Sequence, residues 1–148
     1  MYTRFDKILE KYKYIQKIET IGHAYMVVGD MNNLHYNKEL YIEMLHFAIE
    51  ILNEVKNIRT PNHNLEIRIG IHIGSYIISV LGYTNPRLCI IGKNINKSAR
   101  LQSTSLPNTI QISEEFYNEV KDEDIKFIKN ENVLLKNIGI VTTYSISK

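Results

Sequence analysis

The sequence predicts an α+β sandwich, in which helices cover one face of a mostly antiparallel sheet. Helical and strand patterns follow one another in mixed order along the chain. Several strand patterns are joined directly to the next, without the helix that a parallel connection needs. The chain of 148 residues has the length of one domain, so we expect a single unit over residues 1–148.

The first half of the chain contains two helical patterns on either side of a strand pair. Residues 2–12 carry an apolar stripe at helical spacing, and residues 37–56 form the clearest amphipathic helix. Residues 15–21 and 24–28 read as two closely joined strands, which predicts a hairpin. The polar residues 57–64 are expected to form a surface loop. The apolar face of the longer helix consists of Tyr41, Met44, Leu45, Ala48, Leu52 and Val55.

Short strands dominate the second half. Gly92 opens the segment "GKNINKSARLQS", which is predicted to be a helix, and Ser113 is placed to cap another short helix. The expected strands cover residues 65–73, 76–81, 87–91, 109–112, 125–128, 133–135 and 141–146. The chain begins within a helical pattern, whereas a sheet of this kind normally has an earlier strand at its middle. We therefore expect the N-terminus to be truncated.

Composition and charge exclude several classes of protein. The formal net charge of +2 is too small to indicate a nucleic-acid partner or a membrane surface. Cys89 is the single cysteine, which excludes a disulfide framework and fits a reducing compartment. We expect no membrane-spanning segment and no signal peptide, because the apolar runs are too short.

Four segments in a fixed order carry a family resemblance. They are "FDKILEKY", "KIETIGHAYMVVG", "IRIGIHIGSYIISVLG" and "PRLCIIGKNINKSARLQS". This ordered set resembles the catalytic domain of class III nucleotide cyclases, of the guanylate cyclase type, and covers nearly the whole chain. The resemblance implies a ferredoxin-like βαββαβ core with extra strands, here lacking the first strand. It also implies paired domains with active sites at the interface between them.

The resemblance assigns the reading of the base to Glu19 and Cys89. Glu19 matches a guanine-selecting glutamate, whose carboxylate accepts from the ring N–H and the exocyclic amine of guanine. Cys89 matches the second base-selecting position, near the guanine O6 atom. The pair favours GTP over ATP, because adenylate cyclases usually carry lysine and aspartate at these positions. Without the motif, Glu19 reads as a surface glutamate and Cys89 as a buried structural thiol.

Three further residues match positions that act on the sugar and the phosphates. Asn96 and Arg100 lie four residues apart, so a helix puts them on one face. They match an asparagine that orients the ribose and an arginine that stabilises the transition state. Lys136 aligns with a lysine that contacts the terminal phosphates, although Asn137 replaces the glycine that usually accompanies it. The alternatives are a polar helix face for Asn96 and Arg100, and a solvated lysine for Lys136.

The metal ligands of the family are not matched. His23 stands where the family carries its second metal aspartate, and the first aspartate belongs to the strand expected to be missing. Imidazole is a poor ligand for Mg²⁺, and a transition-metal site of His23 with His72 lacks a third ligand. The chain thus resembles the metal-free, base-reading half of an asymmetric pair. Mg²⁺ or Mn²⁺ would come from a complementary cyclase domain with two metal aspartates.

Two functional hypotheses follow. The first is half of a guanylate cyclase active site, a phosphorus–oxygen lyase that converts GTP to 3′,5′-cyclic GMP and pyrophosphate, inactive as an isolated domain. The second is a catalytically inactive cyclase-homology domain for dimerisation or regulatory nucleotide binding, which His23 favours. Glu19 and Cys89 disfavour an adenylate cyclase. The resemblance implies a cytosolic domain, which in many family members is part of a larger membrane protein.

Overall fold

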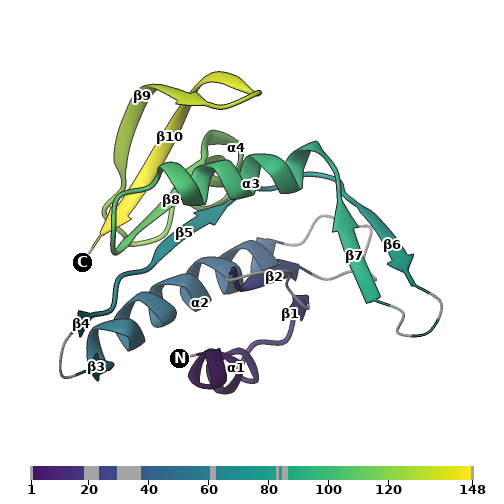
Figure 1. Cartoon of the computed structure of the whole chain (residues 1–148). Helices are drawn as coiled ribbons and strands as arrows, with labels where there is room; N and C mark the ends of the chain where they lie inside the picture. The colour runs from purple at the N-terminus through teal and green to yellow at the C-terminus, as the bar shows by residue number, and fades with distance from the viewer. Residues whose placement is uncertain are drawn as a thin grey trace.

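The computed structural model describes residues 2–18, 24–29, 38–60, 63–82, 84 and 87–147. Two long helices lie on opposite sides of the central strands, and a pair of strands extends away from the body beyond the start of the upper helix (Figure 1). The helices in the described residues are α1 (Tyr2–Leu9), α2 (Lys38–Asn57), α3 (Lys93–Thr104) and α4 (Glu114–Val120). None of them is long and apolar enough to cross a bilayer.

A four-stranded sheet forms the centre of the described residues. Its strand order is β5 (Arg68–Ile71), β8 (Thr109–Ser113), β10 (Gly139–Ser147) and β9 (Ile128–Leu135). β5 runs parallel to β8, and the other two pairings are antiparallel. The described residues also form three antiparallel strand pairs: β1 (Ile15–Ile18) with β2 (Met26–Gly29), β3 (Arg59–Thr60) with β4 (His63–Asn64), and β6 (Ile77–Leu81) with β7 (Arg87–Ile91). The predicted α+β class is confirmed.

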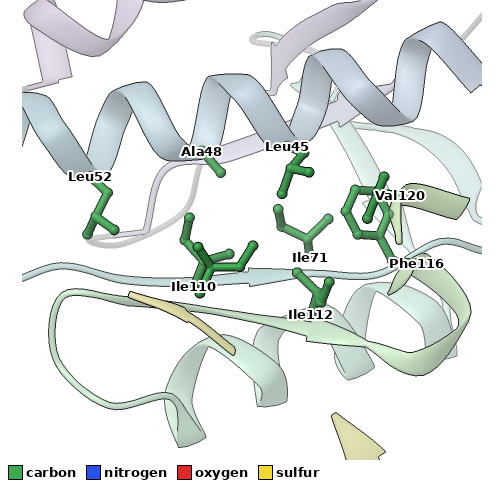
Figure 2. Packing of buried hydrophobic residues seen from close by; sticks show 9 residues of the cluster. Leu45, Ala48, Leu52, Ile71, Ile110, Ile112, Phe116 and Val120 are labelled. Carbon is green, nitrogen blue, oxygen red and sulfur yellow. The ribbon is translucent and has the colours of Figure 1, made fainter. Parts of the chain in front are cut away.

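The main core lies between α2 and the sheet (Figure 2). Leu45 and Leu52 of α2 are fully buried against Ile110 and Ile112 of β8. Burying a leucine side chain stabilises the fold by about 1.5–3 kcal/mol before the loss of chain entropy. The apolar face predicted for this helix is confirmed, and α2 buries a second flank, through Phe47, against α1.

The helices do not all lie on one face, so this part of the prediction was wrong. Ile110 and Ile112 of β8 point to α2, whereas Gln111 between them donates to the backbone of α3 on the other side. All five residues of β8 are buried. The alternation of isoleucine and polar residues, which is typical of a half-exposed strand, here results from two different helix contacts.

Several element bounds also differ from the predicted ones. Helix α1 ends at Leu9, and the predicted loop at 57–64 contains the short β3–β4 pair. The strand predicted over 125–128 is wrong except at Ile128, because one strand, β9, runs from Ile128 to Leu135 and includes the strand predicted over 133–135. The polar residues between the two predicted strands, which broke the apolar pattern, lie on an edge strand that pairs only with β10 in the described chain. An edge strand tolerates polar residues because one of its sides faces water.

Residues of β2, α2, β5 and α3 line an open cleft of about 1130 Å³. Among the described residues, β5 pairs only with β8 and β2 only with β1. Most of the lining is apolar, including Val28, Met44, Ile69 and Ile71.

Candidate active site

Helix α3 presents Asn96 and Arg100 toward solvent. The helix begins after Gly92, whose φ of 142° is rarely adopted by residues with a side chain. Asn96 is exposed and Arg100 is partly exposed, whereas Leu101 is fully buried beneath them. The helix predicted from Gly92 is confirmed, and the two polar residues lie one helical turn apart on its outer side.

Lys136 lies in the tight turn between β9 and β10. The N–H of Ile138 donates to the carbonyl oxygen of Leu135 at 3.0 Å. Asn137 has a φ of 65° and Gly139 a φ of 118°. Asparagine enters this left-handed region more readily than other residues with a side chain. The replacement of the usual glycine by Asn137 is therefore compatible with a turn that presents the lysine.

Arg100 and Lys136 line the same cavity. Its volume is about 510 Å³, and its walls are Arg100, Ser103 and Thr104 of α3 on one side and residues 134–139 of the hairpin on the other. No ion pair joins either cation to a carboxylate in the described part of the chain. Two cationic side chains that line one cavity suit, by their charge, an anion with several charged oxygens.

The residues predicted to read the base are only partly described. Cys89 lies in β7, where it pairs with Ser79 of β6, and Glu19 and His23 lie outside the described residues. Ile18, which precedes Glu19 in the sequence, packs with Ile90, which follows Cys89. The β1–β2 and β6–β7 pairs therefore contact each other through residues that adjoin Glu19 and Cys89 in the sequence.

His72 holds the first turn of α3 in a partly buried hydrogen-bond network. Asn94 Nδ2 donates to the carbonyl oxygen of Ser75 at 2.8 Å, so its Oδ1 is the atom that accepts from His72 Nε2 at 3.0 Å. The other ring nitrogen, Nδ1, accepts from the Ser113 hydroxyl at 2.8 Å. Ser113 caps α4 by accepting from the N–H of Phe116 at 3.2 Å. Both nitrogens of His72 are thus occupied within the protein.

Burial favours the neutral form of this histidine. Burial lowers the pKa of His72 below its ordinary value of 6.5. Glu115 Oε2 lies 3.3 Å from His72 Nδ1 and 3.0 Å from Lys97 Nζ. Burial raises the pKa of Glu115, but the hydrogen bond and charge of Lys97 outweigh this effect and leave that pKa below 4.5. The ion pair is therefore Glu115 with Lys97, while His72 acts as a neutral hydrogen-bonding group.

The described residues do not fit the metal ions that the family resemblance implies. Within the described ranges, no three histidine, cysteine, aspartate or glutamate side chains come together in a way that could hold an ion. Mg²⁺ requires several hard oxygen ligands, and the cavity between Arg100 and Lys136 offers cations instead. No chemical step is therefore assigned to a metal ion held by these residues.

The whole chain matches one protein family. The family described as "Adenylate and Guanylate cyclase catalytic domain" matches residues 1–148. The chain belongs to this family. The guanylate-cyclase resemblance predicted from the four segments is confirmed, and the elements around Arg100 and Lys136 are those of a cyclase catalytic domain.

Named relatives and a solved structure agree with this assignment. The cyclase domain is 34% identical to "Receptor-type guanylate cyclase gcy-28" of Caenorhabditis elegans over 97% of the chain, and 32% identical to "Guanylate cyclase soluble subunit beta-2" of Homo sapiens, also over 97%. It spans only 11% and 23% of their lengths. The guanylate cyclase domain of RhGC from Catenaria anguillulae, solved in complex with GTP, superposes with a TM-score of 0.88 at 28% identity, covering 99% of this chain and 79% of that one.

Sequence reasoning missed Gln111, which joins α3 to the sheet of this cyclase domain. Gln111 is 4% exposed, and it pairs in register with Gly70 of β5. A glycine inside a strand often marks the close approach of another backbone. Gly70 was therefore the one local signal that a helix covers this face of the sheet.

Proposed function

We propose that this cyclase domain forms one half of a guanylate cyclase active site and converts GTP to 3′,5′-cyclic GMP and pyrophosphate when it is paired. The partner is a complementary cyclase domain that carries two metal aspartates. The observation that supports this most is the cavity between α3 and the β9–β10 hairpin, where Arg100 and Lys136 lie together. The triphosphate of a nucleotide is an anion that suits such a pair of cations.

The two cations have separate roles in the proposed reaction. The 3′-hydroxyl of the ribose gives up its proton to water, its oxygen attacks the α-phosphorus, the bond from that phosphorus to the bridging oxygen breaks, and pyrophosphate leaves. Negative charge grows on the phosphoryl oxygens, and the guanidinium of Arg100 offsets it. Lys136 binds the terminal phosphates as a point charge. Asn96, one turn before Arg100 on α3, orients the ribose.

Glu19 and Cys89 give the domain its preference for guanine in this proposal. A carboxylate that accepts from two guanine N–H groups finds no matching donors on adenine. Sites built to satisfy polar groups reject a ligand that lacks them by about 10⁴-fold or more. The contact of Ile18 with Ile90, each next to one of these residues in the sequence, supports a shared base site, as do the names of the relatives.

Mg²⁺ or Mn²⁺ is supplied by the partner domain in this proposal, because His23 replaces an aspartate and the described residues hold no ligand cluster. The isolated domain is then inactive, and two identical copies do not repair the defect. We further propose a cytosolic location, in keeping with relatives whose names include both receptor-type and soluble guanylate cyclases.

Reconstitution tests the proposal directly. The domain, within the full chain in which it occurs, is mixed with a metal-carrying cyclase domain and Mg²⁺ or Mn²⁺, and product formation from GTP and from ATP is compared. We expect cyclic GMP from the mixture only, and little cyclic AMP. The double variant Glu19→Lys/Cys89→Asp should shift the substrate preference from GTP toward ATP.

A catalytically inactive homology domain is the second candidate. His23 favours it, because this position no longer offers an oxygen ligand. Such a domain would bind GTP or its partner without turning the nucleotide over. Its signature is an assembled enzyme whose rate is unchanged by Arg100→Ala in this chain.

A further inference from the structure

A line of hydrogen-bonded polar side chains, buried at Gln111 and Thr143, runs from α3 to the far edge of the sheet. Gln111 Nε2, in β8, donates to the carbonyl oxygen of Leu101 at 2.7 Å and to Thr104 Oγ1 at 2.8 Å. Gln111 Oε1 accepts from the hydroxyl of Thr143 in β10 at 2.8 Å. Thr143 in turn accepts from Asn130 Nδ2 in β9 at 3.2 Å. We call Thr104, Gln111, Thr143 and Asn130 the polar relay.

Gln111 completes the C-terminal end of α3. The last carbonyls of a helix lack helical partners, and here the N–H of Ser105 donates to Gln102 rather than to Leu101. The side chain of Gln111 supplies the missing donor to the Leu101 carbonyl. Gln111 therefore acts as a cap for α3 that comes from the sheet and not from the helix itself.

The chemistry of these groups fixes the orientation of the Gln111 amide. The Leu101 carbonyl can only accept, so it faces the NH₂ group, and the amide oxygen faces the Thr143 hydroxyl. Gln111 is 4% exposed and Thr143 is fully buried. An apolar side chain in place of Gln111 would leave these buried groups without partners, which is costly in a dry interior.

The polar relay reaches both walls of the cavity. The Thr104 hydroxyl donates to the carbonyl oxygen of Arg100 at 2.7 Å, and Thr104 itself lines the cavity. On the other side, β9 and β10 form the hairpin whose turn carries Lys136. A continuous path of hydrogen bonds thus joins the backbone of Arg100 to the strands that present Lys136.

Separate contacts hold the N-terminal part of α3. His72 bonds to Asn94 in its first turn, and the Ser98 hydroxyl donates to the Gly70 carbonyl oxygen at 3.3 Å. At Gly70 the helix lies so close to β5 that an added Cβ would be 2.5 Å from the Ser98 carbonyl oxygen. The side chain of Gln111 supplies directional hydrogen bonds at the C-terminal end of the helix, near Arg100.

We propose that Gln111 is a positioning residue for the cyclase reaction: through the C-terminal turn of α3 it sets where Arg100 lies relative to Lys136. The inference rests on the proposed function. Gln111 lies beneath the helix and acts through Arg100 rather than on the substrate. Because the arginine acts in the transition state, its displacement lowers kcat more than it weakens GTP binding.

The kinetic test uses the assembled enzyme. We expect Gln111→Leu to lower kcat by roughly 10- to 100-fold, the effect of a displacement of about 1 Å, with the KM for GTP changed less than about threefold. Thr143→Val removes one bond of the polar relay and should give a smaller loss in the same direction. Ile112→Val is the matched control: its side chain is buried on the α2 face of the same strand, and kcat should stay within about twofold of the parent value.

A double variant separates positioning from general stability. In an Arg100→Ala background, Gln111→Leu should have no further effect on kcat, since the residue through which it acts is gone. Equal fold-losses in the two backgrounds would overturn the inference. So would a Gln111→Leu variant that behaves like Ile112→Val.

A distance measurement tests the same inference without turnover. Spin labels are placed on the two walls at Ser103→Cys and Leu134→Cys, with Cys89 replaced by serine. Gln111→Leu should shift or broaden the interlabel distance, and Ile112→Val should not. If no pairing makes cyclic GMP but this distance changes, the proposed reaction is wrong and the positioning holds. An unchanged distance overturns the inference whatever the activity.

Discussion

The close contact of α3 with β5 predicts a large effect of a single methyl group at Gly70. A Cβ at this position would lie closest to Gln102 N, 2.5 Å from the Ser98 carbonyl oxygen and 2.9 Å from Gln102 Cα. Ordinary contact begins at 3.4 Å, so the helix would be too close by about 0.9 Å at the Ser98 oxygen and by more at Gln102 N. All three neighbours are backbone atoms of α3, and they can move away only if the whole helix moves.

The expected magnitude follows from two opposing effects. Overpacking of this kind costs about 1–3 kcal/mol, and a rigid neighbour puts Gly70→Ala at the upper end of that range. Since Gly70 does not have a positive φ, alanine also restricts the unfolded chain, which returns about 0.4–1 kcal/mol. We expect a net loss of about 2 kcal/mol in the free energy of unfolding. The displaced helix should also lower kcat of the assembled enzyme by roughly 100-fold.

Urea unfolding and steady-state kinetics of the assembled enzyme measure these effects. Gly29→Ala is the matched control, because the atoms nearest to its added Cβ belong to the flexible Leu40 side chain. The free energy of unfolding of Gly29→Ala should stay within about 0.5 kcal/mol of the parent value. If Gly70→Ala is as stable as Gly29→Ala, then α3 does not lie on β5 as described, and the reasoning is refuted.

Three further predictions concern the charged and titratable groups. Arg100→Ala should lower kcat by roughly 10³-fold or more with little change in KM, and an unchanged kcat would count against a catalytic arginine. Lys136→Ala should raise the KM for GTP more than it lowers kcat. If the variant and the parent have the same KM, Lys136 is a solvated lysine that does not bind the phosphates. Because burial lowers the pKa of His72 below 6.5, the unfolded chain takes up its proton first, and stability should fall as the pH drops below 6.5. His72→Gln should lessen that fall by up to about 1.4 kcal/mol per pH unit. If the free energy of unfolding depends on pH identically in the parent and the variant, the prediction is wrong.

Local patterns predicted the elements with strong periodicity. The spacing of Leu45, Ala48 and Leu52 predicts α2, and all three are buried against the sheet. Strand β8 shows where this reasoning stops. Ile110 and Ile112 alternate with Gln111 as in a half-exposed strand, but a second helix covers the polar side. Which elements pack together depends on contacts between distant segments, and no local period encodes them.

The same distinction applies to the site. Asn96 and Arg100 share a helix, so their spacing alone predicts that they lie on one side. The meeting of Arg100 with Lys136 in one cavity joins distant parts of the chain, and it entered the sequence interpretation only through the family resemblance. Asn137 reads as a departure from the family pattern, yet its φ of 65° shows that the turn tolerates asparagine. The roles of all these site residues remain predictions, and Glu19 and His23 lie outside the described residues.

The most direct test of the central proposal is complementation of a half-site. The partner is a cyclase domain that keeps its two metal aspartates but has lost its own transition-state arginine. Cyclic GMP formation from GTP with Mg²⁺ or Mn²⁺ is measured for each domain alone and for the mixture. The proposal predicts activity only in the mixture, and its loss when this chain carries Arg100→Ala. A mixture that stays inactive in every pairing, or one that ignores Arg100→Ala, would contradict it.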